Sequence, residues 1–253
     1  MENGRREGIM NIGVIFAGGT GTRMNSKDDK PKQFLEVHGK PIIVHTIEIF
    51  EGSKEIDAVI VVCLESWISY MEDLKYKYRL DKIKSIVPGG AVGQESIYRG
   101  LCETRRLYGM DEHIVLIHDG VRPLIDEEII RRNIESVKKY GSAITSSVAK
   151  ETFVLIDDNE EVCEIPSRAH SRIAKAPQSF WLKDILSVHE QALQDGIFNA
   201  IDSCTLMSMY HKKLSIVEGA YENIKITTPD DFYMFRALYD ARENEQLKGE
   251  KDA

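Results

Sequence analysis

The residues with the clearest chemical potential form the glycine-rich loop FAGGTGTRM, which includes the end of the apolar run Ile12–Phe16. Glycines let a ligand approach the backbone amides, while Arg23 in the loop and Lys32 shortly after it add two positive charges. Bare backbone and cations at the end of a strand are typical of a phosphate-binding site. A glycine turn without a ligand is the simpler alternative, but folding alone does not require both cations.

Three known phosphate-binding loops begin with a strand, a glycine loop and a helix. The P-loop needs a lysine directly after Gly18, where Gly19 stands. The dinucleotide-binding fingerprint needs a third glycine, where Met24 stands. The nucleotidyltransferase pattern GGxGxRM, followed by PK, is complete in residues 18–24 and 31–32. In that pattern the glycine amides surround a triphosphate, and the arginine and lysine neutralise it; Lys27 and Lys30 are more simply explained as a solvated rim.

Composition restricts the other possibilities. The chain has 253 residues, 42% of them hydrophobic, which suits one large domain. Its formal net charge of −8 argues against nucleic acid as a partner. The four cysteines lie far apart with no CxxC pair, which argues against a zinc site or a disulfide framework. No signal peptide or membrane-spanning apolar run is present, so we expect a cytoplasmic protein with no membrane partner.

Apolar runs alternate with helical patterns along the chain, as in strands joined by crossover helices. The pattern predicts a doubly wound, mostly parallel α/β sheet of the Rossmann-like nucleotidyltransferase type. One domain is expected over residues 11–242, between a disordered leader (1–10) and a solvated tail (243–253). Strands are predicted at Ile12–Phe16, Ala58–Cys63, Lys84–Val87, His113–Ile117, Ala143–Val148 and Leu214–Val217. Helices are predicted after Pro41, at Trp67–Tyr78, Ser96–Leu107, Ile125–Tyr140 and Leu182–Gln194, from Asp202, and after Thr228.

The alternation breaks between about residues 151 and 172. Phe153–Ile156 and Val162–Ile165 flank the turn sequence Asp157-Asp158-Asn159, which predicts a β-hairpin. The segment is polar enough to project from the body of the protein. We therefore expect an inserted β-hairpin arm.

Together, the motifs resemble the cytidylyltransferase family that includes the methylerythritol-phosphate and ribitol-5-phosphate enzymes, over roughly residues 11–239. The resemblance is carried by FAGGTGTRM, PKQF, PGGAVGQESI, HDGVRP, SRAHSRIAKAPQSF, IDSCT and ENIKITTPDDF. It implies transfer of CMP from CTP to a polyol phosphate, with Mg²⁺ (or another divalent cation) and release of pyrophosphate. It also implies a homodimer, formed here through the arm. Because the acceptor's phosphate oxygen is already anionic, the chemistry needs positioned cations rather than a strong base.

The resemblance also assigns roles to individual residues. It implies CTP contacts from Ala17, Gly18, Gly19, Thr20, Gly21, Gly89, Gly90 and Ser96, and catalytic cations at Arg23, Lys32 and Lys225. It implies acceptor contacts from Asp119, Arg122, Thr152 and Arg168, with Asp119 also placing the metal and Arg168 supplied by the dimer partner. Simpler alternatives stay open at two positions: Asp119 and Arg122 can form a plain ion pair, and Asp202 can merely cap a helix. His118 is better explained by packing or orientation than as a base.

Three positions depart from the family pattern. Gly93 replaces a frequent arginine, Ala91 a common acid, and Ala176 a threonine before Pro-Gln, a hydroxyl that could reach the acceptor. The first two bear on base and ribose contacts, and the third on the acceptor. The FAGG loop and the Gly120-Val121 pair, with the ESWISYMEDL, IPSR and NIKITTPDD segments, are closer to the ribitol branch, whose product feeds teichoic-acid or capsule polymers.

Other functions remain as alternatives at this point. The nearest is the methylerythritol 4-phosphate reaction of isoprenoid synthesis. A sugar-1-phosphate nucleotidyltransferase is the next enzymatic rival, and it would not require CTP. A non-catalytic nucleotide-binding module is disfavoured, because a degenerate copy would be expected to lose its charged site residues.

Overall fold

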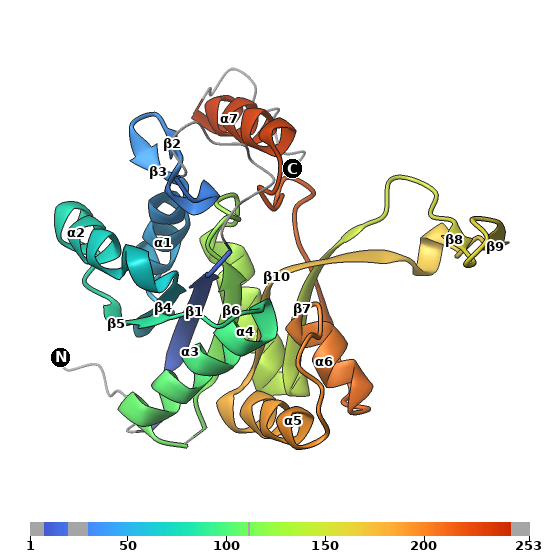
Figure 1. Cartoon of the computed structure of the whole chain (residues 1–253), viewed down its shortest axis with the longest axis horizontal. Helices are drawn as coiled ribbons and strands as arrows, with labels where there is room; N and C mark the ends of the chain where they lie inside the picture. Colours follow the sequence, from blue (N-terminus) through green and yellow to red (C-terminus); the bar gives the residue numbers. More distant parts are fainter. Residues whose placement is uncertain (1–7, 20–29, 111, 244–253) are drawn as a thin grey trace, which may run out of the picture.

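The computed structural model describes residues 8–19, 30–110 and 112–243. A seven-stranded sheet forms its centre (Figure 1). The strand order is β11-β7-β10-β6-β1-β4-β5, and β10 runs antiparallel to both of its neighbours while the other pairs are parallel. The strands are β1 (Asn11–Ala17), β4 (Ala58–Cys63), β5 (Ile83–Pro88), β6 (Ile114–Asp119), β7 (Ser142–Val148), β10 (Arg172–Trp181) and β11 (Ile216–Glu218). The predicted fold class is confirmed.

Helices cover both faces of the sheet, which explains why β4 and β6 are buried at every residue. Adjacent side chains of β1 pack on opposite faces of the sheet: Ile15 belongs to one hydrophobic core and Val14 to the other. The first core is completed by α1 (Ile42–Gly52), α2 (Ile68–Tyr78) and α4 (Glu127–Tyr140). The second is completed by α3 (Gly93–Tyr108), α5 (Leu182–Gln194) and α6 (Ser203–Met209).

A third, smaller core lies under the last helix, α7 (Pro229–Glu243), where Phe235 packs with Ile226 and Val121. The start of α7 is fixed by the Asp231 carboxylate, which accepts hydrogen bonds from the backbone and hydroxyl groups of Thr227 and Thr228. The predicted helix start after Thr228 is therefore confirmed. This anchoring holds the preceding segment, which carries Lys225, against the body of the protein.

Strand β10 was not anticipated. Its sequence contains Pro177, and a proline inside a run argues against a central strand because it removes a ladder donor. In the structure the ladder to β7 shifts register between Ala174 and Gln178, which accommodates the proline. A small hairpin was missed as well, formed by β2 (Glu36–Val37) and β3 (Lys40–Pro41). Observed boundaries otherwise lie within three residues of the predicted ones.

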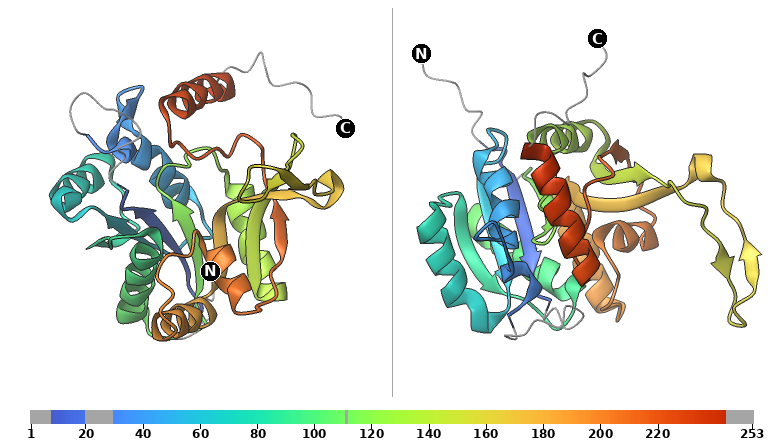
Figure 2. Two further views of the ribbon diagram at one scale, coloured as in Figure 1. Left: turned by 45° about the vertical axis from the view of Figure 1, so that its right-hand side comes forward. Right: turned by 90° about the horizontal axis from the view of Figure 1, so that it is seen from above.

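The predicted arm is present as the hairpin β8 (Leu155–Ile156) and β9 (Val162–Glu164), which projects from the body (Figure 2). The Asp157 carboxylate closes its turn by accepting from the amides of Asn159 and Glu161. The arm is less polar than its sequence suggested. Its exposed apolar side chains are Phe153, Val154, Leu155, Ile156, Val162 and Ile165.

The predicted leader and tail lie mostly outside the described residues. Of the leader, residues 8–10 are described, and the Met10 amide lies 3.2 Å from His113 Nδ1. Among the helices that the structure describes, none has the length and apolar character needed to cross a membrane.

Acid is expected to destabilise the fold partly through His189 on α5. Its ring stacks on Tyr98 of α3 and is buried, and within the described residues neither ring nitrogen has a hydrogen-bond partner. Burial lowers the pKa of His189 from 6.5 to about 4. The unfolded chain therefore takes up the proton first, and stability is lost as pH falls from 6.5 towards 4, by about 1.4 kcal/mol per pH unit.

Denaturant unfolding of the wild type and of His189→Phe at pH 7, 5.5 and 4.5 checks this expectation. Phenylalanine keeps the stacking but has no titrating group, so its stability should depend less steeply on pH over this range. An unchanged slope would show that His189 does not contribute.

Candidate active site

The parallel strands bring the predicted motifs to one edge of the sheet. In the register, Phe16 of β1 pairs with Asp119 of β6, Ala17 pairs with Cys63 of β4, and Cys63 pairs with Pro88 of β5. The glycine loops after β1 and β5 and the HDGVRP segment therefore leave the sheet side by side. Ligands of open α/β sheets bind at this carboxyl edge.

A cavity of about 310 Å³ opens between the two glycine loops. Ser96 of α3 fixes their approach, because the Gly90 amide donates to its hydroxyl at 3.0 Å. A Cβ atom on Gly18 or Gly89 would lie only 3.0 Å from the same oxygen, so the close approach favours glycine at both positions. The predicted residues that line this cavity are Ala17, Gly18, Gly19, Lys32, Gly90, Ser96, Asp119 and Lys225.

The PKQF segment braces the first glycine loop. Gln33, to which the sequence analysis gave no role, is buried and donates its amide hydrogens to the carbonyls of Ala17 and Gly19, at 2.7 and 3.2 Å. Phe34 is buried and stacks on Trp67. These contacts place Lys32 in the cavity wall. Thr20, Gly21 and Arg23 lie outside the described residues, so their roles stay predictions.

Two side chains that the sequence analysis missed brace the second glycine loop. Glu95 accepts from the Ala91 amide at 2.8 Å, and Arg99 donates to the Gly89 carbonyl at 2.8 Å. Arg99 and Glu95 are themselves joined at 2.6 Å. Glu95 and Arg99 both lie on α3, after Ala91 and Gly93, the two positions at which the sequence departs from the expected acid and arginine. Their i, i+4 spacing was a usable signal.

Replacing Glu95 with alanine is expected to raise the KM for CTP by about 3- to 10-fold with little change in kcat, because it loosens the loop without removing a catalytic cation. Steady-state kinetics at saturating acceptor measures this. Glu103→Ala is the matched control: Glu103 lies on the same helix but contacts Ser85 and Arg106 instead of the loop. Equal KM values for the two variants would contradict the bracing role.

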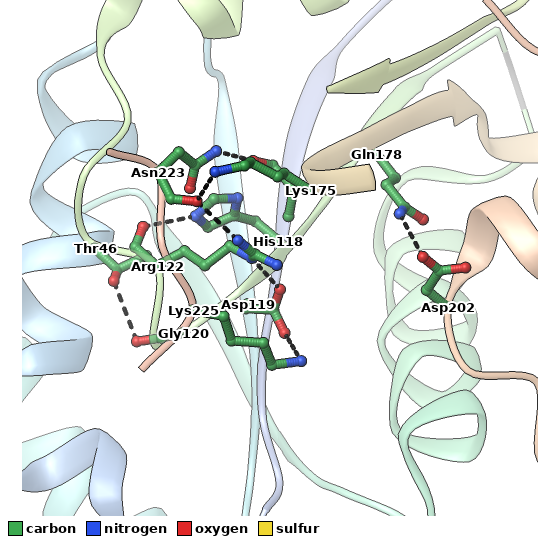
Figure 3. A network of polar contacts seen from close by, with 11 residues as sticks. Thr46, His118, Asp119, Gly120, Arg122, Lys175, Gln178, Asp202, Asn223 and Lys225 are labelled. Carbon is green, nitrogen blue, oxygen red and sulfur yellow. Dashed lines mark hydrogen bonds and ion pairs between the residues drawn. The ribbon is translucent and has the colours of Figure 1, made fainter. Parts of the chain in front are cut away.

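A charged cluster stands at the end of β6 (Figure 3). Lys225 Nζ lies 2.6 Å from one carboxylate oxygen of Asp119, and Arg122 Nε lies 2.8 Å from the other. Burial alone would raise the pKa of Asp119, but the two cations outweigh it and lower the pKa to about 2. Asp119 is therefore ionised at neutral pH. The predicted ion pair between Asp119 and Arg122 is present, and both residues line a cavity; their role as a substrate site stays a prediction.

A second layer holds this cluster. Arg122 also donates to the Asn223 carbonyl, and buried Lys175, which the sequence analysis missed, donates to the carbonyls of Asn223 and Tyr221. His118 is buried beneath, donates to the Arg122 carbonyl, and packs against Phe50. Burial lowers the pKa of His118 to about 4, so it is neutral at pH 7. Through these contacts His118 orients the backbone at Arg122.

A second cavity, of about 290 Å³, adjoins the first and shares Asp119, Lys225, Phe16 and Gly93 with it. Its other walls come from β6, from β10 and from the start of α6, and they include Arg122, Lys175, Ala176, Gln178 and Asp202. The two cavities therefore meet at the Asp119–Lys225 ion pair. Such a junction can hold two substrates with their reacting groups next to each other.

The two predicted arm residues do not join this site within the chain. Arg168 donates to the Thr152 hydroxyl at 3.0 Å, and both side chains are exposed. Neither lines the two cavities described above.

A metal ion at this site would take most of its ligands from the bound substrate rather than from the protein. Among the described residues, no group of three or more His, Cys, Asp or Glu side chains is placed to hold one. Asp119 does offer a carboxylate in the wall of both cavities. One carboxylate fits Mg²⁺, which proteins commonly bind through one or two carboxylates together with substrate phosphates and water.

Two glycine loops, a cation in the cavity wall and a second cavity at the same edge define a nucleotidyltransferase class of site. The chain belongs to the IspD family, 2-C-methyl-D-erythritol 4-phosphate cytidylyltransferase, which it matches over residues 11–240. It is therefore a member of a cytidylyltransferase family.

Within that family, relatives at 53% and 63% identity carry the name of the ribitol branch, and one at 38% carries the name of the methylerythritol branch. The chain is 63% identical to the ribitol-5-phosphate cytidylyltransferase of Streptococcus agalactiae serotype V, over 95% of this chain and 100% of the relative. It is 53% identical to the ribitol-5-phosphate cytidylyltransferase of Vibrio parahaemolyticus, with the same coverage. A 2-C-methyl-D-erythritol 4-phosphate cytidylyltransferase of Clostridium acetobutylicum is 38% identical, over 90% of this chain and 97% of the relative.

Among solved structures, the 4-diphosphocytidyl-2C-methyl-D-erythritol synthase of Anaerococcus prevotii superposes with a TM-score of 0.78. The two sequences are 29% identical, and the superposition covers 91% of this chain and 96% of the Anaerococcus chain. The structural similarity therefore extends over most of the chain.

Proposed function

We propose that this protein transfers CMP from CTP to D-ribitol 5-phosphate, giving CDP-ribitol and pyrophosphate in the cytoplasm. The observation that carries the proposal is the junction of two cavities at Asp119 and Lys225. The cavity with the glycine loops suits the nucleotide, and the cavity with Arg122 suits an anionic acceptor. The relatives at 53% and 63% identity, with their printed names, support ribitol 5-phosphate as that acceptor.

The reaction is a direct displacement at the α-phosphorus of CTP. An oxygen of the acceptor phosphate forms the new bond to this phosphorus, while the bond to the β-phosphate oxygen breaks and its electron pair leaves with pyrophosphate. The attacking oxygen is already anionic, so no side chain has to remove a proton. Lys225 at the junction and Lys32 in the nucleotide cavity hold the charge that develops during transfer. We assign Arg23 the same role from its place in the loop.

Mg²⁺ is part of the proposal. When bound, the ion neutralises triphosphate charge and favours departure of pyrophosphate. Asp119 is the residue that would hold it from the cavity wall, together with oxygens of the nucleotide. Lys225 and Arg122 keep this carboxylate ionised and oriented.

The choice of nucleoside triphosphate gives the first test of the proposed reaction. The glycines at Gly89 and Gly90 let a base approach the backbone of this loop, and we assign the discrimination of cytosine from uracil to hydrogen bonds formed there. Turnover with Mg²⁺ and ribitol 5-phosphate is therefore expected with CTP, and at least about 100-fold less with UTP, GTP or ATP. Mass spectrometry should find CDP-ribitol as the product. Equal use of UTP would contradict this assignment.

We further propose that two copies associate through the arm, so that Thr152 and Arg168 reach the acceptor cavity of the partner. The support is the row of exposed apolar side chains on an arm that projects from the body. Such a surface is typical of an interaction site in a protein of this size.

The double variant Val162→Asp, Ile165→Asp tests this assembly. The wild type is expected to sediment as a dimer and the variant as a monomer, with turnover reduced at least about 10-fold because the site loses Arg168. Tyr76→Asp, at an exposed position of α2, is the control and should stay dimeric and active. A monomeric wild type with full turnover would overturn the assembly but not the reaction.

A further inference from the structure

Gln178 and Asp202 form a wall of the acceptor cavity that the reaction described above does not use. Gln178 comes from β10 and Asp202 stands at the N-terminus of α6. Figure 3 shows this pair apart from the cluster of Asp119, Arg122 and Lys225, although both groups line the same cavity. The cavity thus has a cationic wall and a second wall that carries a carboxylate.

The Asp202 carboxylate is held firmly in place. One oxygen accepts from the Thr205 amide at 2.7 Å, which is the predicted helix cap, and the other accepts from the Gln178 amide nitrogen at 2.9 Å. The Gln178 carbonyl in turn accepts from the Cys204 amide at 2.8 Å. Each carboxylate oxygen can accept two hydrogen bonds, so a fixed acceptor capacity remains for a ligand.

Charge determines how a phosphorylated polyol would lie between these walls. Its phosphate is attracted by Arg122 and Lys225 and repelled by Asp202. Its hydroxyl groups are hydrogen-bond donors, and a carboxylate is a strong acceptor for them. Ala174 and Ala176 line the same cavity, and their short side chains occupy little of its volume.

We propose that Asp202, oriented by Gln178, accepts hydrogen bonds from the hydroxyl groups of the acceptor and so selects a polyol chain. This inference rests on the proposed function, since it concerns the acceptor of that reaction. It makes Asp202 a specificity-determining residue as well as a helix cap. The reacting phosphate stays at the Asp119–Lys225 junction, and the polyol chain extends towards α6.

The test compares two acceptors in two variants. Asp202→Ser and Asp202→Asn both remove the charge while keeping a side chain that caps helices well. The acceptors are ribitol 5-phosphate and n-pentyl phosphate, which has the same chain length but no hydroxyl groups. Asp184→Ser is the matched control, because Asp184 is likewise an aspartate at the start of a helix, in the first turn of α5, but is not part of the cavity wall.

We expect the Asp202 variants to lose about 10- to 100-fold in kcat/KM for ribitol 5-phosphate, the range for a hydrogen bond to a charged group. The KM for CTP and the rate with n-pentyl phosphate should stay within about twofold of wild type. An equal loss with both acceptors in both variants would mean a purely structural role and overturn the inference alone. If the wild type does not convert ribitol 5-phosphate, the proposed function fails, and this inference fails with it.

Discussion

Replacing Lys225 with alanine is expected to lower kcat by about 10²- to 10³-fold, the loss seen when one group that stabilises a transition-state charge is removed. Lys225 lines both cavities and lies 2.6 Å from Asp119, at the junction where the proposed reaction brings the two substrates together. Its loss removes a positive charge from the junction and leaves Asp119 with Arg122 as its described cationic partner. The measurement is the rate of pyrophosphate release at saturating CTP, Mg²⁺ and acceptor.

Lys225→Arg separates charge from structure. Arginine keeps the positive charge on a longer side chain, so it should recover a large part of kcat if charge is the essential property. The side chain of Lys225 is 42% exposed, and we therefore expect thermal unfolding of both variants to stay near that of the wild type. A kcat within threefold of wild type for Lys225→Ala would contradict the role assigned to this residue.

Replacing Lys32 with alanine is expected to be nearly as damaging, again about 10²- to 10³-fold in kcat, with an increased KM for CTP. The 3₁₀ turn Lys32–Phe34 places this residue in the wall of the nucleotide cavity, and Gln33 ties the turn to the glycine loop. In the reaction we propose, this cation contacts the triphosphate both before and during transfer. Initial rates over a range of CTP concentrations separate the two effects.

Lys30→Ala is the matched control for Lys32. It lies two residues earlier, its amine pairs with exposed Glu36 at 3.1 Å, and it does not line the nucleotide cavity. Its loss should change kcat by less than about threefold, as for other exposed ion pairs. Similar losses for Lys30→Ala and Lys32→Ala would show that general positive charge, rather than position, matters.

The sequence predicted the sheet well where a strand is buried on both faces. Ala58–Cys63 reads as an uninterrupted apolar run because helices cover it from both sides, and its predicted bounds are the observed ones. Strand β10 lacks this signal. Its first three residues are exposed or half-buried, it contains a proline, and its pairing between β6 and β7 depends on residues far away in the chain.

Residues of the candidate site could be predicted where glycines or charged residues occur close together in one motif. The glycine loops and the Asp119–Arg122 pair lie where their spacing indicated. Lys175 was missed because a single lysine inside a strand gives no signal until the fold brings it to the Tyr221 and Asn223 carbonyls. The role of Gln33 could likewise not be predicted, because the carbonyls of Ala17 and Gly19 come within reach of its side chain only when the loop has formed.

We propose ribitol 5-phosphate as the acceptor of this protein. The most direct test compares kcat/KM for ribitol 5-phosphate and for 2-C-methyl-D-erythritol 4-phosphate, with CTP and Mg²⁺, by pyrophosphate release. We predict a preference of at least about 100-fold for ribitol 5-phosphate, because a site built to bind particular hydroxyl groups discriminates strongly against a chain that places them differently. A preference for the methylerythritol substrate would contradict the claim and place the protein in isoprenoid synthesis.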